Sequence, residues 1–305
     1  MAEIFPLLVV VVGLTLFEII SSIDNAVINA EVLSTVGQRA RRWFLTWGMF
    51  FAVFVVRGIL PFLIVFLATP SLGIWGTLTA TFSSDPAVIA AIEKTAPILL
   101  MGGGTFLVFL FLYWLFMEEK KYGFVGERFI HRHSVWFYAA TSIFVSVLVW
   151  FALKEDPILA FAAVVGSTGF FIIQGFKDNA AKQEQQLLSS SASDISKVLY
   201  LEALDLTFSI DGVLGAFAFT FAVPLILLGN GIGAIVLRQI TVSNIERIKR
   251  YAYLKNGAMY SILALGAIMV AEGFGAHIPY WISPIVTIGF VVFFFWKSLQ
   301  DQKRV

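Results

Sequence analysis

Long apolar runs, in which polar residues do not alternate with apolar ones, make up most of the chain. A helix needs about 20 mostly apolar residues to cross a bilayer, and backbone polar groups inside a bilayer are satisfied only in helices or closed barrels. Runs of this length without alternation predict helices. The pattern therefore predicts an all-α polytopic membrane protein with nine spans, at residues 4–30, 43–67, 97–117, 134–153, 157–176, 197–219, 221–242, 256–272 and 280–297.

Two connecting segments are more polar than the rest. Residues 70–96 contain Asp85, Pro86 and Glu93, and predict a loop with a short interfacial helix. Residues 177–196 are the most polar stretch and predict a flexible connector. We therefore divide the chain into a first repeat half, spans four and five with the connector, and a second repeat half, at residues 1–133, 134–196 and 197–305.

The composition supports the membrane prediction. Hydrophobic residues make up 59% of the chain and charged residues 13%, whereas a soluble domain carries about 25% charged residues. The net charge of +1 gives no reason to expect nucleic acid as a partner. The absence of cysteine excludes disulfides, thiolate metal sites and cysteine nucleophiles. The first apolar stretch lacks a basic flank and a small-residue cleavage site, so we expect a retained helix.

Basic residues concentrate in every second connection between the predicted spans. These connections hold Arg39, Arg41, Arg42, Lys120, Lys121, Arg128, Arg132, Lys177, Lys182, Arg247, Lys249, Arg250 and Lys255. The alternate connections hold only Lys94 and Lys154. Because cytoplasmic loops carry an excess of Lys and Arg, the N-terminus is expected outside and the C-terminus in the cytoplasm. We expect a multi-pass protein of the inner (plasma) membrane, with lipids as its surroundings.

A short motif occurs twice along the chain. An offset of 187 residues superposes Glu18 on Asp205, and it superposes the Ser-Ile-Asp run that ends at Asp24 on the one that ends at Asp211. The next predicted span carries one arginine in each half, Arg57 and Arg238. The motif spans are five apart, an odd number, so they cross the membrane in opposite directions. This predicts an inverted-topology repeat with a substrate site near the midplane.

Five carboxylates lie inside predicted spans, and two arginines offset part of their charge. Each carboxylate costs about 2.5–3.5 kcal/mol at a helix centre unless it is compensated. The excess of negative charge favours a cation or protons over an anionic substrate. The carboxylates are Glu18, Asp24, Glu202, Asp205 and Asp211, and the compensating arginines are Arg57 and Arg238.

Helical geometry separates these carboxylates into two groups. One stripe of a regular helix holds Thr15, Glu18, Ser22, Asn25 and Asn29. Asp24 and Asp211 lie about 120° from Glu18 and Asp205 on their helices. Asp24 and Asp211 therefore either pair elsewhere, with Arg57 and Arg238, or lie where the helices are broken. We favour a break beside Ser-Ile-Asp, which would free backbone carbonyls as ligands.

The available ligand atoms are carboxylate, amide and hydroxyl oxygens. Such atoms suit Mg²⁺, Ca²⁺ or Mn²⁺ and do not choose among the three. We expect the hydroxyls of Ser22 and Ser209 to support the ligands. A divalent cation is thus predicted as a substrate, and no prosthetic group is expected.

The two motifs, together with Asn230-x₇-Arg238, resemble the signatures of TerC integral membrane proteins, a family of the LysE-like transporter superfamily. The resemblance implies metal-ion efflux, with Mn²⁺ exported by several members. Departures indicate a divergent branch: many members read Asp-Ser where this chain reads Asp211-Gly212, and the segments at 70–96 and 177–196 are long. The positions that the resemblance assigns to metal are Glu18, Asp24, Asn25, Glu202, Asp205, Asp211 and Asn230.

Two other functions fit parts of the pattern. A proton-coupled exporter of a small organic or amino-acid substrate, as elsewhere in that superfamily, is the first alternative. An intramembrane aspartyl hydrolase would use Asp24 and Asp211 as a dyad, but it needs little nearby positive charge. We therefore expect a transporter and no enzyme. The sequence leaves the oligomeric state open, a homo-oligomer included.

Overall fold

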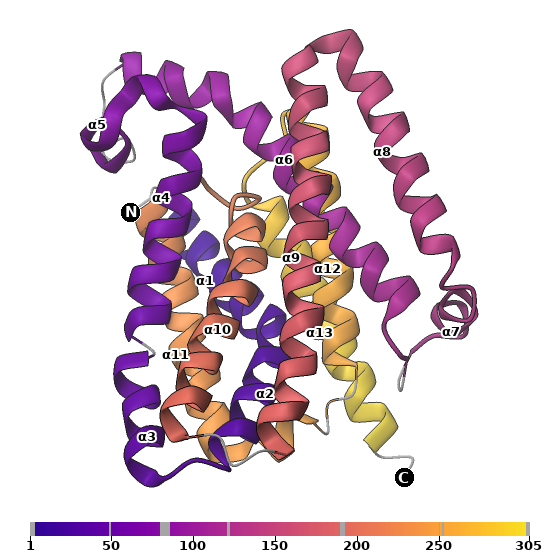
Figure 1. The fold of residues 1–305 in the computed structure, drawn as a ribbon. Coiled ribbons are helices and arrows are strands. Elements are labelled where there is room, and N and C mark those ends of the chain that lie inside the picture. Colours follow the sequence, from indigo (N-terminus) through magenta and orange to yellow (C-terminus); the bar gives the residue numbers. More distant parts are fainter. Residues whose placement is uncertain are drawn as a thin grey trace.

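The fold is given by a computed structural model, which describes residues 4–48, 50–79, 86–120, 123–189, 193–249, 251 and 253–302. Every regular element in these residues is a helix (Figure 1). The first predicted span is divided into α1 (Ile4–Ser21) and α2 (Ile23–Leu33). The second consists of two wide, π-helical stretches followed by a regular helix, namely η1 (Phe44–Gly48), η2 (Phe51–Val56) and α4 (Arg57–Ala68).

The remaining predicted spans correspond to one helix each. They are α6 (Pro86–Met117), α8 (Trp136–Glu155), α9 (Pro157–Ser189), α10 (Asp194–Ala216), α11 (Val223–Lys249), α12 (Leu254–Gly273) and α13 (Ile282–Gln302). Short helices lie in the connections: α3 (Gln38–Trp43), η3 (Pro70–Leu72), α5 (Gly73–Thr79) and α7 (Val125–His131).

Within the described residues, five helices are long and apolar enough to cross a membrane. They are Lys94–Met117, Trp136–Glu155, Pro157–Ala180, Leu254–Gly273 and Ile282–Gln302. The bent pair α1–α2 makes a sixth if it is one span, and α4 and α11 contain shorter apolar stretches. The chain is thus an all-helical, polytopic membrane protein. The count of nine spans and the orientation remain predictions.

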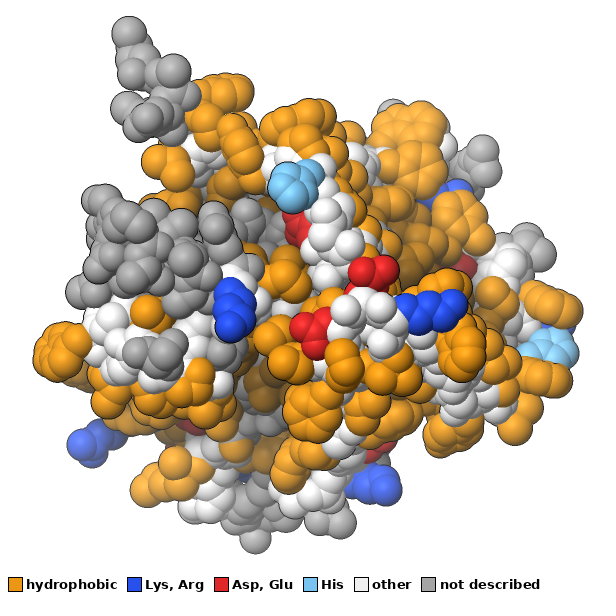
Figure 2. Space-filling view, turned by 90° about the horizontal axis from the view of Figure 1, so that it is seen from above, with side chains coloured by type: hydrophobic (Ala, Val, Ile, Leu, Met, Phe, Trp, Pro, Cys, Tyr) orange, Lys and Arg blue, Asp and Glu red, His pale blue; other side chains and the backbone are white. Residues whose placement is uncertain are grey.

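The surface of the bundle fits this conclusion. Large apolar side chains stay open to the surroundings, among them Trp150 and Phe161 with 64% and 68% of their surface exposed. Figure 2 shows hydrophobic side chains around most of the rim, with charged side chains fewer and scattered. Such an extensive apolar surface is what a lipid environment requires and what water opposes.

Two predicted connections are more helical than expected. The short helix α5 lies in the 70–96 segment as predicted, but α6 begins at Pro86, so the start predicted at residue 97 is wrong. The prediction of a flexible connector is also wrong up to Ser189, because α9 continues to that residue. The sequence of this stretch is rich in Ala, Gln, Lys and Leu, which favour helix even where no core is buried. Ser193 then caps α10 by accepting a hydrogen bond from the Ser196 N–H.

The break beside Ser-Ile-Asp occurs in one half of the repeat only. The axes of the helical segments Phe5–Ser21 and Asn25–Leu33 differ by 55°. Across the break, Ser22 N–H still bonds to Glu18 O and Ala26 N–H to Ser22 O, so these two carbonyls stay within the helical hydrogen bonding. In the second half α10 continues through Ser209 and Asp211 without a break, so the prediction fails there.

The two motif helices run antiparallel. At one end of the pair, Lys197 near the start of α10 donates to Thr35 Oγ1, which follows α2, at 3.0 Å. At the other end, the ring of Phe17 in α1 lies 5.7 Å from that of Phe219, which follows α10. The order of contacts is therefore reversed between the two helices, as an inverted repeat requires.

Helix α6 packs between α9 and α12, and glycines set the distance between these helices. A Cβ on Gly166 of α9 would lie 2.1 Å from the carbonyl oxygen of Gly102, and one on Gly104 would lie 2.8 Å from that of Gly266 in α12. No larger residue fits at these positions without separating the backbones, as in other tightly packed membrane helices.

Candidate functional site

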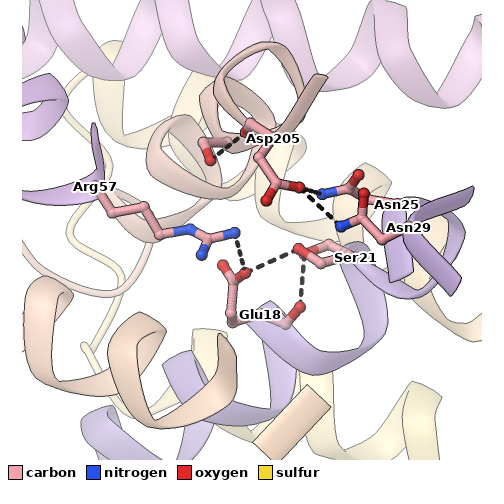
Figure 3. A network of polar contacts seen from close by, with 8 residues as sticks. Glu18, Ser21, Asn25, Asn29, Arg57 and Asp205 are labelled. Carbon is pink, nitrogen blue, oxygen red and sulfur yellow. Dashed lines mark hydrogen bonds and ion pairs between the residues drawn. The ribbon is translucent and has the colours of Figure 1, made fainter. Parts of the chain in front are cut away.

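Among the motif carboxylates whose side chains the structure describes, Glu18 of α1 is the most buried, with none of its surface exposed. Its Oε1 forms an ion pair with Arg57 at 2.6 Å (Figure 3). The same oxygen accepts a hydrogen bond from Ser22 Oγ at 2.8 Å. Its other oxygen, Oε2, is buried and has no hydrogen-bond partner. The protein therefore provides partners for only one of the two carboxylate oxygens of Glu18.

The local structure explains why these groups meet. Ser22 lies at the bend between α1 and α2, one turn after Glu18, so its hydroxyl reaches back to the carboxylate. Arg57 is the first residue of α4, directly after the wide turns of η2. Gly233 brings α11 against the same point, because a Cβ there would lie 2.7 Å from Glu18 Cβ. Wide helical turns of this kind often occur at functional sites.

Asp205 of α10 faces Glu18 from the antiparallel motif helix, with 6% of its surface exposed. Its Oδ1 accepts two amide donors from α2, Asn25 at 2.5 Å and Asn29 at 3.0 Å (Figure 3). Ser209 donates to the backbone carbonyl of Asp205 at 2.6 Å. This hydroxyl is thus used within its own helix, whereas Ser22 contacts a motif carboxylate directly.

A polar cavity lies between these helices, with about 50 Å³ of space that water could occupy. That is room for a few water molecules or one small ion. Three buried acceptor oxygens of its lining residues lack a hydrogen-bond partner, Glu18 Oε2, Asn25 Oδ1 and Asn29 Oδ1. The polar residues that line it are Glu18, Ser22, Asn25, Asn29, Arg57, Asp205 and Arg238.

The two arginines are used differently. Arg57 pairs with Glu18, whereas Arg238 donates to the backbone carbonyl of Phe44. The guanidinium carbon of Arg238 also lies 4.2 Å from the centre of the Phe44 phenyl ring. Asp211 pairs with Lys177 of α9. The alternative in which Arg238 pairs with Asp211 is therefore wrong. The side chain of Asp24 lies outside the described residues.

Three predicted ligands are not among the residues that line this cavity. Asp211 is held by Lys177 on the α9 side of its helix. Glu202 packs against Gly48, where a Cβ would lie 1.9 Å from Glu202 Oε1, and neither carboxylate oxygen has a partner. Asn230 is fully buried, and neither polar atom of its amide is bonded. In the described part of the chain, no three side chains of His, Cys, Asp or Glu converge as a metal site.

Helical spacing predicts Asn29 on the same stripe as Glu18, Ser22 and Asn25, and Asn29 lines the cavity with them, although it was not among the predicted ligands. One residue of these networks was not predicted from the sequence. Lys177 was placed in a connection, because the apolar run ends at residue 176. Only the continuation of α9 places its side chain beside Asp211.

Comparison with known proteins places this chain in a family. A family model described as "Protein of unknown function (DUF475)" matches residues 23–305. The chain belongs to the DUF475 family. The match begins at the bend between α1 and α2, so Glu18 and Ser22 precede it. The other polar residues of the cavity lie within it.

A curated relative, "Uncharacterized membrane protein YceF" of Bacillus subtilis (strain 168), is 28% identical over 109 residues. The aligned region covers 35% of this chain and 42% of that protein, so less than half of the relative is matched. No solved structure was found to match the chain. The name of the relative agrees with a membrane protein, and neither it nor the family description names TerC, so that resemblance stays a prediction.

Proposed function

We propose that this DUF475 protein is a membrane transporter that exports a divalent metal cation, with Mn²⁺ favoured, through the cavity between α1–α2 and α10. One observation carries the proposal: Glu18 and Asp205, buried and drawn from two antiparallel helices, line the same small cavity. Isolated charges in such surroundings are costly, and they persist in membrane proteins mainly where they serve a function.

The chemistry of the cavity supports a hard cation as cargo. Its unpartnered acceptors are one carboxylate oxygen of Glu18 and the amide oxygens of Asn25 and Asn29. Oxygen ligands of this kind suit Mn²⁺, Mg²⁺ and Ca²⁺, and the resemblance to TerC proteins selects Mn²⁺ among them. Of the other predicted ligands, Asp24, Glu202, Asp211 and Asn230 remain candidates for other steps of the transport cycle.

The antiparallel arrangement supports alternating access. Inverted repeats commonly bind cargo between their halves, and transport then results from one half rocking against the other. The direction, export, comes from the resemblance to TerC proteins. The basic loops predict a C-terminus in the cytoplasm of an inner (plasma) membrane protein. Protons that enter in exchange on the carboxylates would drive the cation outward against the membrane potential, which is negative inside.

An organic substrate is the second candidate, because Arg57 and Arg238 line the cavity and could bind a substrate carboxylate. The size of the cavity favours the cation, since about 50 Å³ accommodates a few waters and no amino acid. A hydrolase is less well supported. Asp211 is paired with Lys177, and a catalytic carboxylate dyad needs two acids that share one proton.

The test is Mn²⁺ flux in proteoliposomes that contain the full chain. Wild type is compared with Glu18→Gln and Asp205→Asn, and with Asp178→Asn as a matched control. The Asp178 carboxylate bonds to Tyr113 and Gln174 and does not line the cavity. We expect flux in wild type and in the control within twofold of each other, and at least tenfold less in the two cavity variants.

Two results would refute the proposal. The first is a wild-type protein that moves no divalent cation under any gradient. The second is a folded Glu18→Gln variant that transports as fast as wild type. Flux of an amino acid or of another organic ion by wild type, without cation flux, would support the second candidate.

A further inference from the structure

The two motif helices contact each other twice through equivalent positions. The offset of 187 residues that relates Glu18 to Asp205 also relates Asn25 to Gly212. In one contact, Asn25 Nδ2 donates to Asp205 Oδ1 at 2.5 Å. In the reciprocal contact, a Cβ on Gly212 would lie 3.0 Å from Glu18 Oε2. The second half thus keeps the approach of the two positions but lacks the side chain that would donate.

The missing side chain leaves the two carboxylates unequal. Asp205 Oδ1 holds two amide hydrogen bonds, from Asn25 and Asn29. The Oε1 atom of Glu18 is bonded by Arg57 and Ser22, while its Oε2 is buried with no partner. An unsatisfied buried carboxylate oxygen costs free energy, and native structures keep such atoms chiefly where something else completes them.

We propose that Gly212 determines how the cargo binds: because this residue has no side chain, Glu18 Oε2 stays free and becomes the carboxylate oxygen that holds the divalent cation. Asp205 then acts mainly as a positioning residue, since its Oδ1 holds the amides of α2 in place. This inference rests on the proposed function, and it adds which carboxylate binds the cation directly.

A hydroxyl at position 212 separates this inference from simple crowding. In Gly212→Ser, the hydroxyl can donate to Glu18 Oε2 and compete with the cation for the same oxygen. Gly212→Ala adds the same Cβ without a donor. At 3.0 Å the Cβ is tight, so the Glu18 carboxylate must shift by a few tenths of an ångström in both variants. The alanine variant therefore measures how much the carboxylate shift alone changes Mn²⁺ binding.

The first measurement is Mn²⁺ binding to the purified full chain by titration calorimetry. Gly169→Ser is the matched control, because a Cβ on Gly169 of α9 meets nothing within 4 Å. We expect the control to bind like wild type, and Gly212→Ser to bind at least tenfold more weakly than Gly212→Ala. Equal or tighter binding by the serine variant would overturn the inference, and Mn²⁺ binding by wild type would leave the proposed function standing.

A second comparison does not depend on the folding of the position-212 variants. If Glu18 holds the cation directly and Asp205 positions the amides, Glu18→Gln weakens Mn²⁺ binding at least tenfold more than Asp205→Asn does. Equal losses in the two variants would overturn the inference. A wild-type protein that binds no Mn²⁺ would overturn both the inference and the proposed cargo.

Discussion

Arg57 and Glu18 form an ion pair of 2.6 Å between α4 and α1, with 7% and 0% of their side chains exposed. Each partner compensates a charge that the surroundings cannot solvate, and removal of one partner from a buried pair costs far more than the pair contributes. The pair therefore joins the first motif helix to the second span of the same half.

Arg57→Gln should destabilise the protein by about 3–5 kcal/mol, because it leaves the Glu18 charge buried and uncompensated. The double variant Arg57→Gln with Glu18→Gln should recover much of this loss, since neither charge remains. Thermal unfolding in detergent measures both. Lys255→Gln is the control: its pair with Glu118 is one-third exposed and should contribute at most about 1 kcal/mol. Equal losses of stability in Arg57→Gln and Lys255→Gln would contradict the prediction.

Asn29→Ala removes one of the two donors to Asp205 Oδ1. We expect a loss of stability of about 1–3 kcal/mol, the usual effect of leaving a buried polar group short of a partner. Mn²⁺ flux should fall as well, because Asp205 becomes free to move. Asn179→Ala is the control, since Asn179 is exposed on α9. Unchanged stability and flux in Asn29→Ala would show that Asn25 alone holds Asp205.

Gly233→Ala tests the close approach of α11 to α1. The added Cβ would lie 2.7 Å from Glu18 Cβ and 2.8 Å from the carbonyl oxygen of Thr15, so the helices must separate. Overpacking of this kind costs about 1–3 kcal/mol. Gly175→Ala, which meets nothing within 4 Å, is the control. The melting temperature of the two variants gives the comparison, and a Gly233→Ala protein as stable as its control would refute this packing.

The stability of the C-terminal end of α6 should depend on pH through Lys120. Burial lowers the pKa of Lys120 from 10.5 to about 8, with Lys255 acting in the same direction and Glu118 and Glu127 opposing. The unfolded chain therefore binds more protons between about pH 8 and 10.5, and the contribution of Lys120 to stability rises over that range. Melting temperatures of wild type should rise relative to Lys120→Met between these pH values. A constant difference between the two proteins would contradict the shift.

The sequence predicted the helical class and the pairing of the motifs because apolar runs and repeated carboxylates are local signals. The antiparallel order of α1–α2 and α10 agrees with the prediction that the two motif spans are five apart, an odd number. What failed depended on tertiary context. The partner of Asp211 could not be predicted, because Lys177 was expected in a connection, whereas α9 continues as a helix to Ser189.

The bend in the first motif also shows the limit of sequence analysis. Ser-Ile-Asp occurs in both halves, yet α1–α2 bends and α10 does not. The residues that differ are those around the motif, such as Asn25 opposite Gly212. The same motif is therefore bent in one half and a regular helix in the other. The two carboxylates, Glu18 and Asp205, also differ in their hydrogen bonds.

The glycine contacts of α6 have a consequence for movement within the bundle. Gly102 with Gly166, and Gly104 with Gly266, bring backbone against backbone, so no side-chain rotamer can absorb a displacement between these helices. We therefore expect α6, α9 and α12 to shift together as one body. Relative displacement is then expected where α1 bends into α2 and where η1 and η2 contain wide turns beside the cavity.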